Sequence, residues 1–517
     1  VAILVILAFL LLVAGAINFS NLSIAASIRR AKEVGIRKTL GSSRWQLIRQ
    51  FLGETALQCV ISLVLALVIA QLVLPAFAKS FGINLSFFGA NNFGFILLQI
   101  FASLVIVVIL SGLYPAVVLS LVNTNKVLKG EYSTGSKGRT LRNGLIVAQF
   151  VVAAFFVFAI LVINRQIRFM ETRDKGFSGE QVVRIEATQN SRDRNFKATR
   201  AALSGIPGVS FVSKSTKVPG DKFSDTSTFR FSYAGAMHRI ASVKISTDYF
   251  STLDVKLVKG RLFDDRQTDQ QTRSAILNET AAQKLGGDDI LGKPVFFEGC
   301  DTIPVQVIGI VRDFNVQGME TAVQPMIYTI GNKACLYQSG GALLAKVNTE
   351  KTASTIAALT QAWKSVEPDL PIRYSFLDDD FQRLFSAHVR LQQIISVFAV
   401  IAIVISVMGL FAMTAYLTGQ RKKEIGVRKV LGASVSNLAS LLSRDFIKLV
   451  ILSVVIAIPV GYWATNQWLD TFAYRITPGW SMFALAAGLV LLIAIITVSF
   501  QTIKAARSNP VDSLRSE

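Results

Sequence analysis

Residues 287–294, GDDILGKP, are the part of this 517-residue chain that comes nearest to a nucleotide-binding motif. They match the glycine and lysine spacing of a phosphate-binding loop, G-x-x-x-x-G-K. Pro294 stands where that loop needs Ser or Thr, so a hydroxyl for magnesium is missing. Asp288 and Asp289 would also repel phosphate. The sequence therefore does not predict ATP hydrolysis by this chain.

Two other sets of residues could support chemistry, but each has a simpler interpretation. The acidic triplet 378–380 could bind a cation. Acids at the start of a helix also favour the positive end of its dipole and cap its N–H groups, and we prefer that interpretation. The two histidines, His238 and His388, lie far apart in sequence and outside any recognisable triad context. We expect neither a metal site nor a catalytic centre.

The three cysteines fall into two groups. Cys59 lies in an apolar run and is expected to be a small buried residue. Cys300 and Cys335 share a long polar segment. If that segment is extracytoplasmic, they could form a disulfide, and the alternative is two unpaired buried thiols. The sequence leaves both possibilities open.

One basic dodecamer occurs twice, as KEVGIRKTLGSS at 32–43 and KEIGVRKVLGAS at 423–434, with eight of twelve positions identical. Its Glu and Arg are four residues apart in both copies, so each pair can form a salt bridge along a helix. The glycine after the leucine suits the left-handed residue that follows a helix end. Ser43 and Gln46 have the spacing of a capping box, whereas Ser434 and Asn437 form a weaker one. Each copy therefore predicts a helix, a sharp turn and a short amphipathic helix.

Membrane anchoring alone explains the basic charge of the two copies but not the repeated order of their residues. We therefore interpret the copies as a docking surface used twice.

The composition indicates a membrane protein. Hydrophobic residues make up 51%, charged residues 17%, and the mean hydropathy is +0.47. Average soluble proteins carry about 25% charged residues. Seven uncharged stretches are long enough to cross a bilayer. They lie within 1–28, 55–78, 80–125, 143–164, 391–420, 449–469 and 476–503.

The net charge of +21 follows from topology. Four segments, 29–50, 126–142, 421–448 and 504–517, hold 22 basic and six acidic residues. Seven crossings place all four on one side, which the positive-inside rule makes cytoplasmic. Topology therefore accounts for most of the charge, and a nucleic-acid partner is not required. Anionic headgroups of the lipid bilayer would add to the attraction.

The same count places residues 165–390 outside the membrane. Strand-like and helix-like runs alternate there, which predicts an α+β domain with mixed sheets. We expect helical stalks at 164–174 and 376–393. Residues 1–130 and 391–517 repeat a three-helix unit, and their tails, LVNTNKVLKG and RSNPVDSLRS, align. A span at 143–164 and the outer domain precede only the second unit. Symmetry then predicts that the chain is a fragment beginning inside a helix, and that the intact protein has eight spans.

The sequence resembles the MacB/FtsX-like permease family of ABC transporters in its fused two-half form, with a truncated N-terminus. The resemblance rests on R-x-K-E-[VI]-G-[IV]-R-K-x-L-G-[SA]-S, on the tail N-P-V-D-S-L-R-x-E, and on 248–265, 275–295 and 307–318 in the outer domain. In that family, the loop carrying the first motif includes a coupling helix that docks on a separate ATPase subunit. The resemblance assigns this role to Glu33, Gly35, Arg37, Lys38, Gly41 and Ser43, and to Glu424, Gly426, Arg428, Lys429, Gly432 and Ser434.

The resemblance implies a permease subunit in the inner membrane with two ABC ATPase subunits as partners and no cofactor or metal of its own. A periplasmic adaptor or substrate protein could be a further partner. ATP hydrolysis would drive rearrangement of the periplasmic domain and so export or release a periplasmic or lipid-derived substrate. Two alternatives stay open: a receptor or scaffold without an energy source, and a membrane enzyme acting outside.

Overall fold

The computed structural model of the chain consists of two compact units. The helical unit comprises Val1–Arg165, Arg390–Gln467 and Thr477–Glu517, and the head unit comprises Gln166–Val389 and Trp468–Ile476. The residues described are 2–81, 93–120, 136–186, 196–221, 228–265, 269, 273–297, 304–330, 341–348, 352–420 and 422–506.

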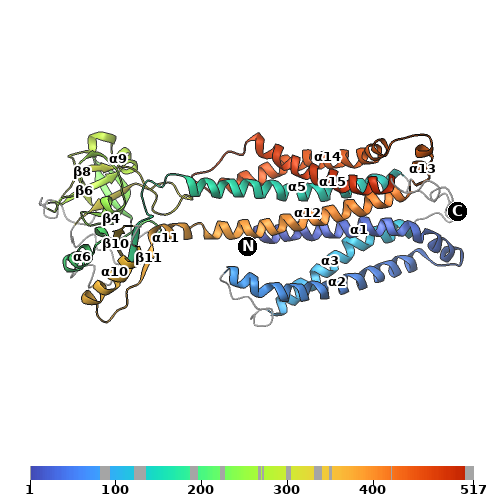
Figure 1. Cartoon of the computed structure of the whole chain (residues 1–517), viewed down its shortest axis with the longest axis horizontal. Coiled ribbons are helices and arrows are strands. Elements are labelled where there is room, and N and C mark those ends of the chain that lie inside the picture. Colours follow the sequence, from blue (N-terminus) through green and yellow to red (C-terminus); the bar gives the residue numbers. More distant parts are fainter. Residues whose placement is uncertain are drawn as a thin grey trace. The chain divides into compact units, whose positions relative to one another are not determined.

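The helical unit contains the long apolar helices that the composition predicts. Figure 1 shows them side by side as a bundle. Seven helices in the described part of the chain are long and apolar enough to cross a membrane, which confirms the predicted number of spans. These seven helices are α1 (Ala2–Thr39), α2 (Arg44–Phe81), α3 (Phe93–Ser120), α5 (Ser136–Thr172), α12 (Ser386–Gln420), α14 (Val435–Leu469) and α15 (Trp480–Ala506). The short helix α13 (Lys422–Val430) lies between α12 and α14 in the chain.

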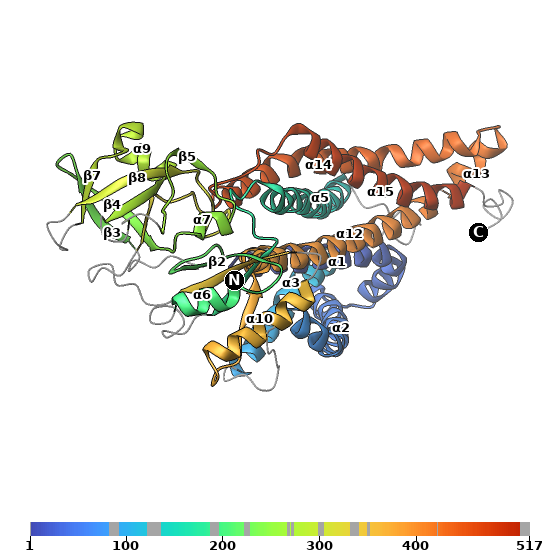
Figure 2. The ribbon, with the colours of Figure 1, turned by 60° about the vertical axis from the view of Figure 1, so that its left-hand side comes forward.

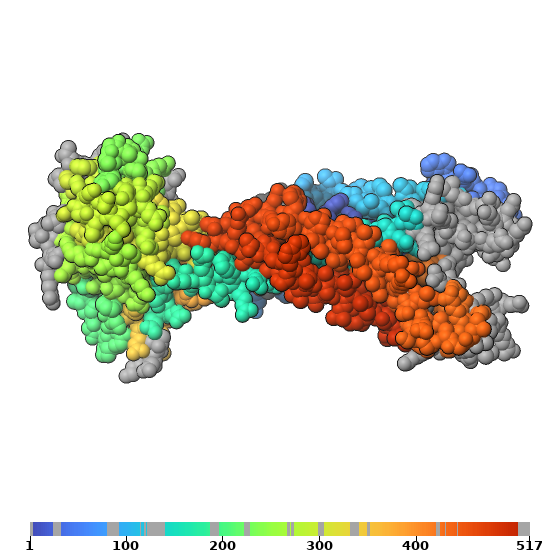
Figure 3. All heavy atoms as spheres, turned by 90° about the horizontal axis from the view of Figure 1, so that it is seen from above, coloured from blue at the N-terminus to red at the C-terminus, as the bar shows by residue number. Residues whose placement is uncertain are grey.

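Helix α5 is the most buried of these helices, whereas α2 and α3 expose their apolar side chains as lipid-facing helices do. The ring of Phe158 on α5 stacks on that of Phe483 on α15, with 4.5 Å between their centroids. Helices α14 and α15, orange to red in Figure 3, lie along α5 at this point. The second three-helix unit therefore packs around α5.

A polar side chain joins α5 to α12 within the apolar part of the bundle, and Asn18 of α1 lies beside the same point of α12. The amide of Gln149 donates to the carbonyl oxygen of Ile405 at 2.8 Å. Gly409 permits this approach, because a Cβ there would stand 2.4 Å from Asn18 Oδ1 and 2.9 Å from Gln149 Nε2. Interhelical hydrogen bonds and small residues are the usual means of joining helices in a bilayer.

The head unit contains two sheets, and Figure 2 shows them from the side. The four-stranded sheet has the order β11 (Tyr374–Phe376), β1 (Val182–Glu186), β10 (Ala342–Val347) and β2 (Val209–Ser215), with antiparallel pairing throughout. Helices α6 (Phe196–Ser204) and α10 (Thr352–Val366) cover it and bury Trp363 and Leu359.

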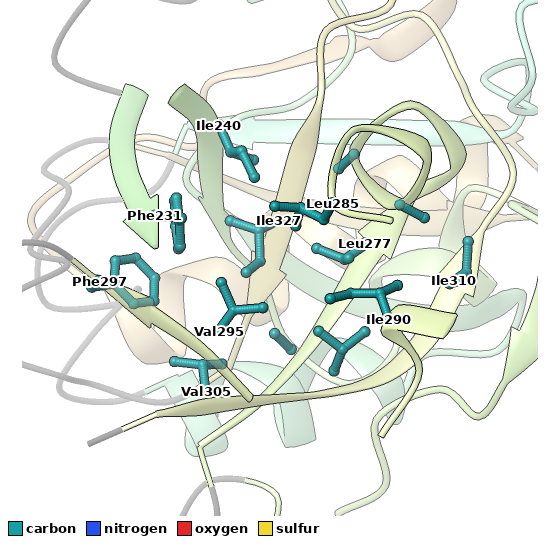
Figure 4. Close-up of a cluster of buried hydrophobic side chains, with 14 residues drawn as sticks. Phe231, Ile240, Leu277, Leu285, Ile290, Val295, Phe297, Val305, Ile310 and Ile327 are labelled. Atoms are coloured by element: carbon teal, nitrogen blue, oxygen red, sulfur yellow. The ribbon is translucent and has the colours of Figure 1, made fainter. Parts of the chain in front are cut away.

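The seven-stranded sheet is mixed and partly closed. Its order is β5 (Leu257–Gly260), β8 (Val305–Val311), β6 (Ser274–Asn278), β9 (Met326–Thr329), β4 (Ala236–Lys244), β3 (Thr228–Tyr233) and β7 (Pro294–Phe297). Strand β7 also pairs with β8, so the strands from β8 to β7 form a ring. Figure 4 shows the apolar residues inside it, among them Phe231, Leu277 and Ile327. The short helix α9 (Glu279–Lys284) contributes to the same core.

The head confirms the α+β prediction and corrects two details. The smaller sheet is antiparallel and not mixed. The expected stalk at 376–393 is also not one helix: Phe376 belongs to strand β11, α11 covers Leu377–Arg383, and α12 begins at Ser386. Pairing of Phe376 with Val183 and burial of Phe381 hold the start of this segment in the head. The other stalk is confirmed, because α5 continues to Thr172.

One buried carboxylate gives the head a defined pH dependence. Asp269 is 1% exposed and accepts two hydrogen bonds from the Arg261 guanidinium, at 2.7 and 2.8 Å. The Ser274 hydroxyl and the Asp264 N–H also donate to it, each at 3.0 Å. The Arg261 hydrogen bonds hold the pKa of Asp269 below its ordinary value. Asp269 therefore stabilises the fold above the unfolded pKa of about 3.9, and this contribution is lost as the pH falls through the folded pKa.

Replacing Asp269 by Asn should destabilise the head at pH 7 by about 1–3 kcal/mol, because the donors around it lose a charged acceptor. The deficit should shrink as the pH falls below about 4, since the wild-type carboxylate is then protonated. Denaturant-dependent hydrogen exchange of β6 amides measures the difference in the solubilised chain. Asp289→Asn, at an exposed site, is the control. A deficit that stays constant from pH 7 to pH 3 would contradict this assignment.

Candidate functional site

The two copies of the dodecamer fold into two turns of matching geometry, which we call the coupling turns (residues 32–47 and 423–438). In the first, the N–H of Ser42 donates to the Arg37 carbonyl oxygen at 3.0 Å, and that of Gly41 donates to Lys38 at 3.1 Å. In the second, Ala433 donates to Arg428 at 3.0 Å, and Gly432 donates to Lys429 at 3.1 Å. This pair of bonds defines the Schellman helix ending.

The glycines adopt the backbone conformation predicted for them. The φ angle is +94° at Gly41 and +90° at Gly432. Both lie in the left-handed region, which an L residue with a Cβ enters only at a cost of about 1–2 kcal/mol. The surrounding space is open in both places, so the backbone angle alone accounts for glycine.

The predicted ion pairs are also confirmed. Glu33 and Arg37 lie 2.7 Å apart, and Glu424 and Arg428 lie 2.8 Å apart. All four side chains are 40–53% exposed. Exposed pairs at this spacing contribute only about 0.3–0.5 kcal/mol, so stability does not explain why they recur. They instead place one carboxylate and one guanidinium at the same position on each turn.

The caps of the following helices differ as the sequence predicts. The N–H of Ser43 donates to Gln46 Oε1 at 2.8 Å, and the N–H of Gln46 donates to Ser43 Oγ at 3.3 Å. This is a complete capping box. In the second copy, the N–H of Asn437 donates to Ser434 Oγ at 3.2 Å.

The expected short amphipathic helix is not a separate element. Helix α2 runs without interruption from Arg44 to Phe81, and α14 runs from Val435 to Leu469. Gly53 does not end α2, because a single glycine costs a helix only about 1 kcal/mol. The helix after each turn is therefore one rod that includes a membrane span.

Buried apolar residues join the two arms of each turn. Val34 packs with Leu47 and Phe51 in the first copy. Ile425 packs with Leu438, Ala433 and Val435 in the second. Gly35 is buried in the first turn, and Gly426 lies within α13. A displacement of the turn should therefore move both arms together.

Sequence analysis missed the most exposed large hydrophobic residues of the coupling turns. Leu40 is 81% exposed and Leu431 is 79% exposed. Ile36 and Val427, one helical turn earlier, are also exposed. The repeat contained a signal for them, which is the leucine before the glycine in both copies. A leucine at a helix end among charged residues has no apolar core nearby in which to be buried. Each turn presents an apolar pair next to its ion pair. We call Leu40 and Leu431 the apical leucines.

The two turns differ in their surroundings. In the first copy, Arg37 also donates to Gln50 Oε1 at 2.5 Å, and Gln50 donates to Glu54 at 3.1 Å. Lys38 Nζ donates to the carbonyl oxygen of Ser120, at the end of α3, at 2.6 Å. Burial and, to a lesser extent, the neighbouring Arg44 charge lower the pKa of Lys38.

The other sequence candidates lie in short helices of the head. Residues 287–290 form a short 3₁₀ helix that precedes strand β7, the reverse of the strand–loop–helix order of a phosphate-binding loop. The acidic triplet lies in the first turn of α11, as predicted. Within it, Asp378 pairs with Lys175, and Asp380 lies 3.7 Å from Arg184. Among the described residues, groups of three or more His, Cys, Asp or Glu residues that could hold a metal ion are absent.

The cysteine predictions are only partly tested. Cys59 is a buried free thiol, as expected. Cys300 and Cys335 lie outside the described residues, as do the two aligned tails. The proposed disulfide and the tail repeat therefore stay predictions.

Comparison with known proteins agrees with this arrangement. The FtsX-like permease C-terminal model matches residues 5–124 and 396–510, and the MacB-like periplasmic core domain model matches residues 144–362. The macrolide export ATP-binding/permease protein MacB of Aggregatibacter actinomycetemcomitans is 27% identical over 200 residues, 38% of this chain and 30% of that protein. MacB 2 of Aeromonas hydrophila is 22% identical over 350 residues, 66% of this chain and 51% of that protein.

The chain thus spans about half or less of the length of these relatives. Among solved structures, the periplasmic region of MacB from Actinobacillus actinomycetemcomitans aligns with 42% of this chain and 97% of that one, at 19% identity and a TM-score of 0.31. Two matches to one permease model on either side of a periplasmic core domain reproduce the internal repeat seen in the sequence. The chain belongs to the MacB/FtsX-like permease family of ABC transporters.

Proposed function

We propose that this chain is the permease subunit of an inner-membrane ABC transporter, and that its coupling turns receive the motion of two separate ATPase subunits. The observation that carries the proposal is the matched geometry of the turns, down to the same helix ending, ion pair and apical leucine. A surface built twice in one chain fits a partner that is present twice.

The charge pattern supports a cytoplasmic position for both turns. They lie in the basic segments 29–50 and 421–448, which the positive-inside rule places in the cytoplasm. The relatives' printed names combine ATP-binding and permease functions. In this chain, we assign ATP binding to the partner, because the described part lacks a phosphate-binding loop in its required context.

The apical leucines suit insertion into a partner. Full burial of an exposed leucine contributes about 1.5–3 kcal/mol. A few such anchors, surrounded by weaker polar contacts, carry most of the energy of a typical interface. The neighbouring Glu33–Arg37 and Glu424–Arg428 pairs would orient the contact more than strengthen it.

Motion received at the turns has continuous helices along which to travel. Helices α2 and α14 begin directly after the turns, and α5 continues from its membrane span to Thr172. Coupling of this kind needs an element with two arrangements that both ends influence. We assign that role to α5 and to the jointed connection formed by α11 and α12.

For the substrate, we propose a periplasmic or lipid-derived molecule. The seven apolar stretches of the sequence contain no Asp, Glu, Lys or Arg, so a path for ions through the bundle is not favoured. The rival function, a receptor or scaffold without an energy source, predicts that an ATPase does not co-purify with the chain.

Leu40→Ala and Leu431→Ala should each weaken binding of the partner ATPase about tenfold, and the double variant about a hundredfold, because each anchor loses roughly 1.4 kcal/mol. Titration of the partner ATPase against the chain in nanodiscs measures this. Leu370→Ala, at an exposed site in the head, is the control and should leave the affinity unchanged. Wild-type chain that binds no ATPase would refute the proposed function, and unchanged affinity in the double variant would refute the role of the leucines.

Glu33→Ala and Glu424→Ala should leave ATPase binding within about threefold of wild type, since exposed ion pairs contribute little. They should nevertheless reduce the stimulation of ATP hydrolysis by the chain, because the turn no longer holds its orientation. Hydrolysis rates and affinities measured on the same samples separate the two effects. Full stimulation in the double variant would exclude the ion pairs from coupling.

Gly41→Ala and Gly432→Ala should weaken the coupling turns by about 1–2 kcal/mol, because alanine resists the left-handed backbone that both turns require. Faster hydrogen exchange at Ser42 and Ala433 would report this. Gly53→Ala is the matched control, because Gly53 lies inside a helix with open space around it. That change should stabilise α2 by about 1 kcal/mol. Equal exchange at Ser42 and Ala433 in the turn variants and the wild type would contradict the predicted strain.

A further inference from the structure

The short segment that ends α14 and leads towards α15 belongs with the head, although it is part of the second three-helix unit. Trp468–Ile476 clusters with Gln166–Val389 in one compact unit. Its two neighbours in the chain, α14 and α15, are membrane-spanning candidates. We call this segment the latch loop.

Gln166 of α5 holds the latch loop through its backbone. Its Nε2 donates to the carbonyl oxygen of Tyr474 at 2.9 Å, and its Oε1 accepts from the N–H of Ile476 at 2.9 Å. The side chain thus pairs with the loop in the way that a neighbouring strand would. Gln166 is 0% exposed, so loss of either bond would leave a buried polar group without a partner.

Glu320 forms a second attachment. Its carbonyl oxygen accepts from the N–H of Ala473 at 2.9 Å, and its carboxylate lies 2.6 Å from His388 Nε2. The His388 ring packs against Phe472, with 5.0 Å between centroids, and Phe472 packs on Trp468 at 4.8 Å. The loop is therefore held at residues from three separate parts of the head sequence.

An aromatic contact completes the attachment. The Arg173 guanidinium lies over the Tyr474 ring, 4.1 Å from its centroid. A cation at this distance is attracted by the face of the ring. Leu469 and Phe472 are both buried, so apolar packing holds the loop in addition to its hydrogen bonds.

We propose that the latch loop is a non-covalent attachment through which α14 and α15 act on the head directly. Helix α14 begins at Val435, immediately after the second coupling turn, and leads into the loop at its other end. A displacement of that turn then reaches the head along α14, in addition to α5 and α12. The transmission role rests on the proposed function, whereas the attachment itself does not.

The attachment is tested on the full chain in nanodiscs by hydrogen exchange. Gln166→Leu should accelerate exchange of residues 470–477 at least about tenfold, because the buried acceptor for Ile476 is lost. Gln166→Glu keeps an acceptor for that N–H and should accelerate it less. Gln382→Leu, an exposed glutamine on α11, should change nothing in the loop. Protection of β6 and β9 amides confirms that each variant is folded.

The transmission role is tested with the partner ATPase and a non-hydrolysable ATP analogue. Gln166→Leu should bind the ATPase as the wild type does, yet lose at least half of the nucleotide-linked change in head exchange. Wild-type exchange of residues 470–477 in Gln166→Leu would overturn the latch. A loosened loop with an undiminished nucleotide response would overturn the transmission role alone. Failure of the wild type to bind any ATPase would overturn the proposed function and the transmission role together, while the first experiment still decides the attachment.

Discussion

Both coupling turns depend on one backbone constraint, which is that a glycine in the left-handed conformation ends the helix. A helix leaves its last carbonyl groups without partners, and Gly41 and Gly432 let the following N–H groups turn back to satisfy them. The chain can then reverse within a few residues and begin the next rod. Because the reversal is tight, Leu40 and Leu431 are left at the outer surface instead of in the core.

The head is subject to a different constraint: the strands at the edges of a sheet have backbone groups without hydrogen-bond partners. Strand β7 closes the larger sheet by pairing with β8 as well as β3, so a single apolar core fills the ring. Closure removes the free edges of the strands in the ring, which otherwise invite pairing with other chains. Within the described residues, strand β5 pairs only with β8 and stays outside the ring. A body closed in this way is better suited to move as one piece than an open sheet would be. Its attachments at α5, α11 and the latch loop can then act on it together.

Local features of both units could be predicted from the sequence because their causes lie within a few residues. The i,i+4 pair of Glu33 and Arg37, the capping box of Ser43 and the seven apolar spans all follow from spacing alone. The mixture of strands and helices in the head also follows from the alternation of strand-like and helix-like runs. The α5 extension to Thr172 follows in the same way from a helix that lacks a breaker.

What escaped prediction depends on residues far apart in the chain. The pairing of β7 with β8, the capture of Phe376 by β1 and the contact of Gln166 with Tyr474 join segments whose sequences carry no sign of one another. The continuity of α2 past Gly53 was missed because a change from charged to apolar residues resembles a boundary. The apical leucines were overlooked because hydrophobic residues are expected inside a protein, and only their exposure shows otherwise.

Gly409 has a wider consequence for how the two halves can evolve. The missing side chain on α12 leaves room beside Gly409 for the amides of both Asn18, from the first half, and Gln149 of α5. Even one methyl group there would collide with both amides. The duplicated halves are therefore not independent modules, because Asn18 of one half packs beside Gly409 of the other. A substitution at either position must fit the side chains around the other. The two copies should therefore diverge most slowly at these positions.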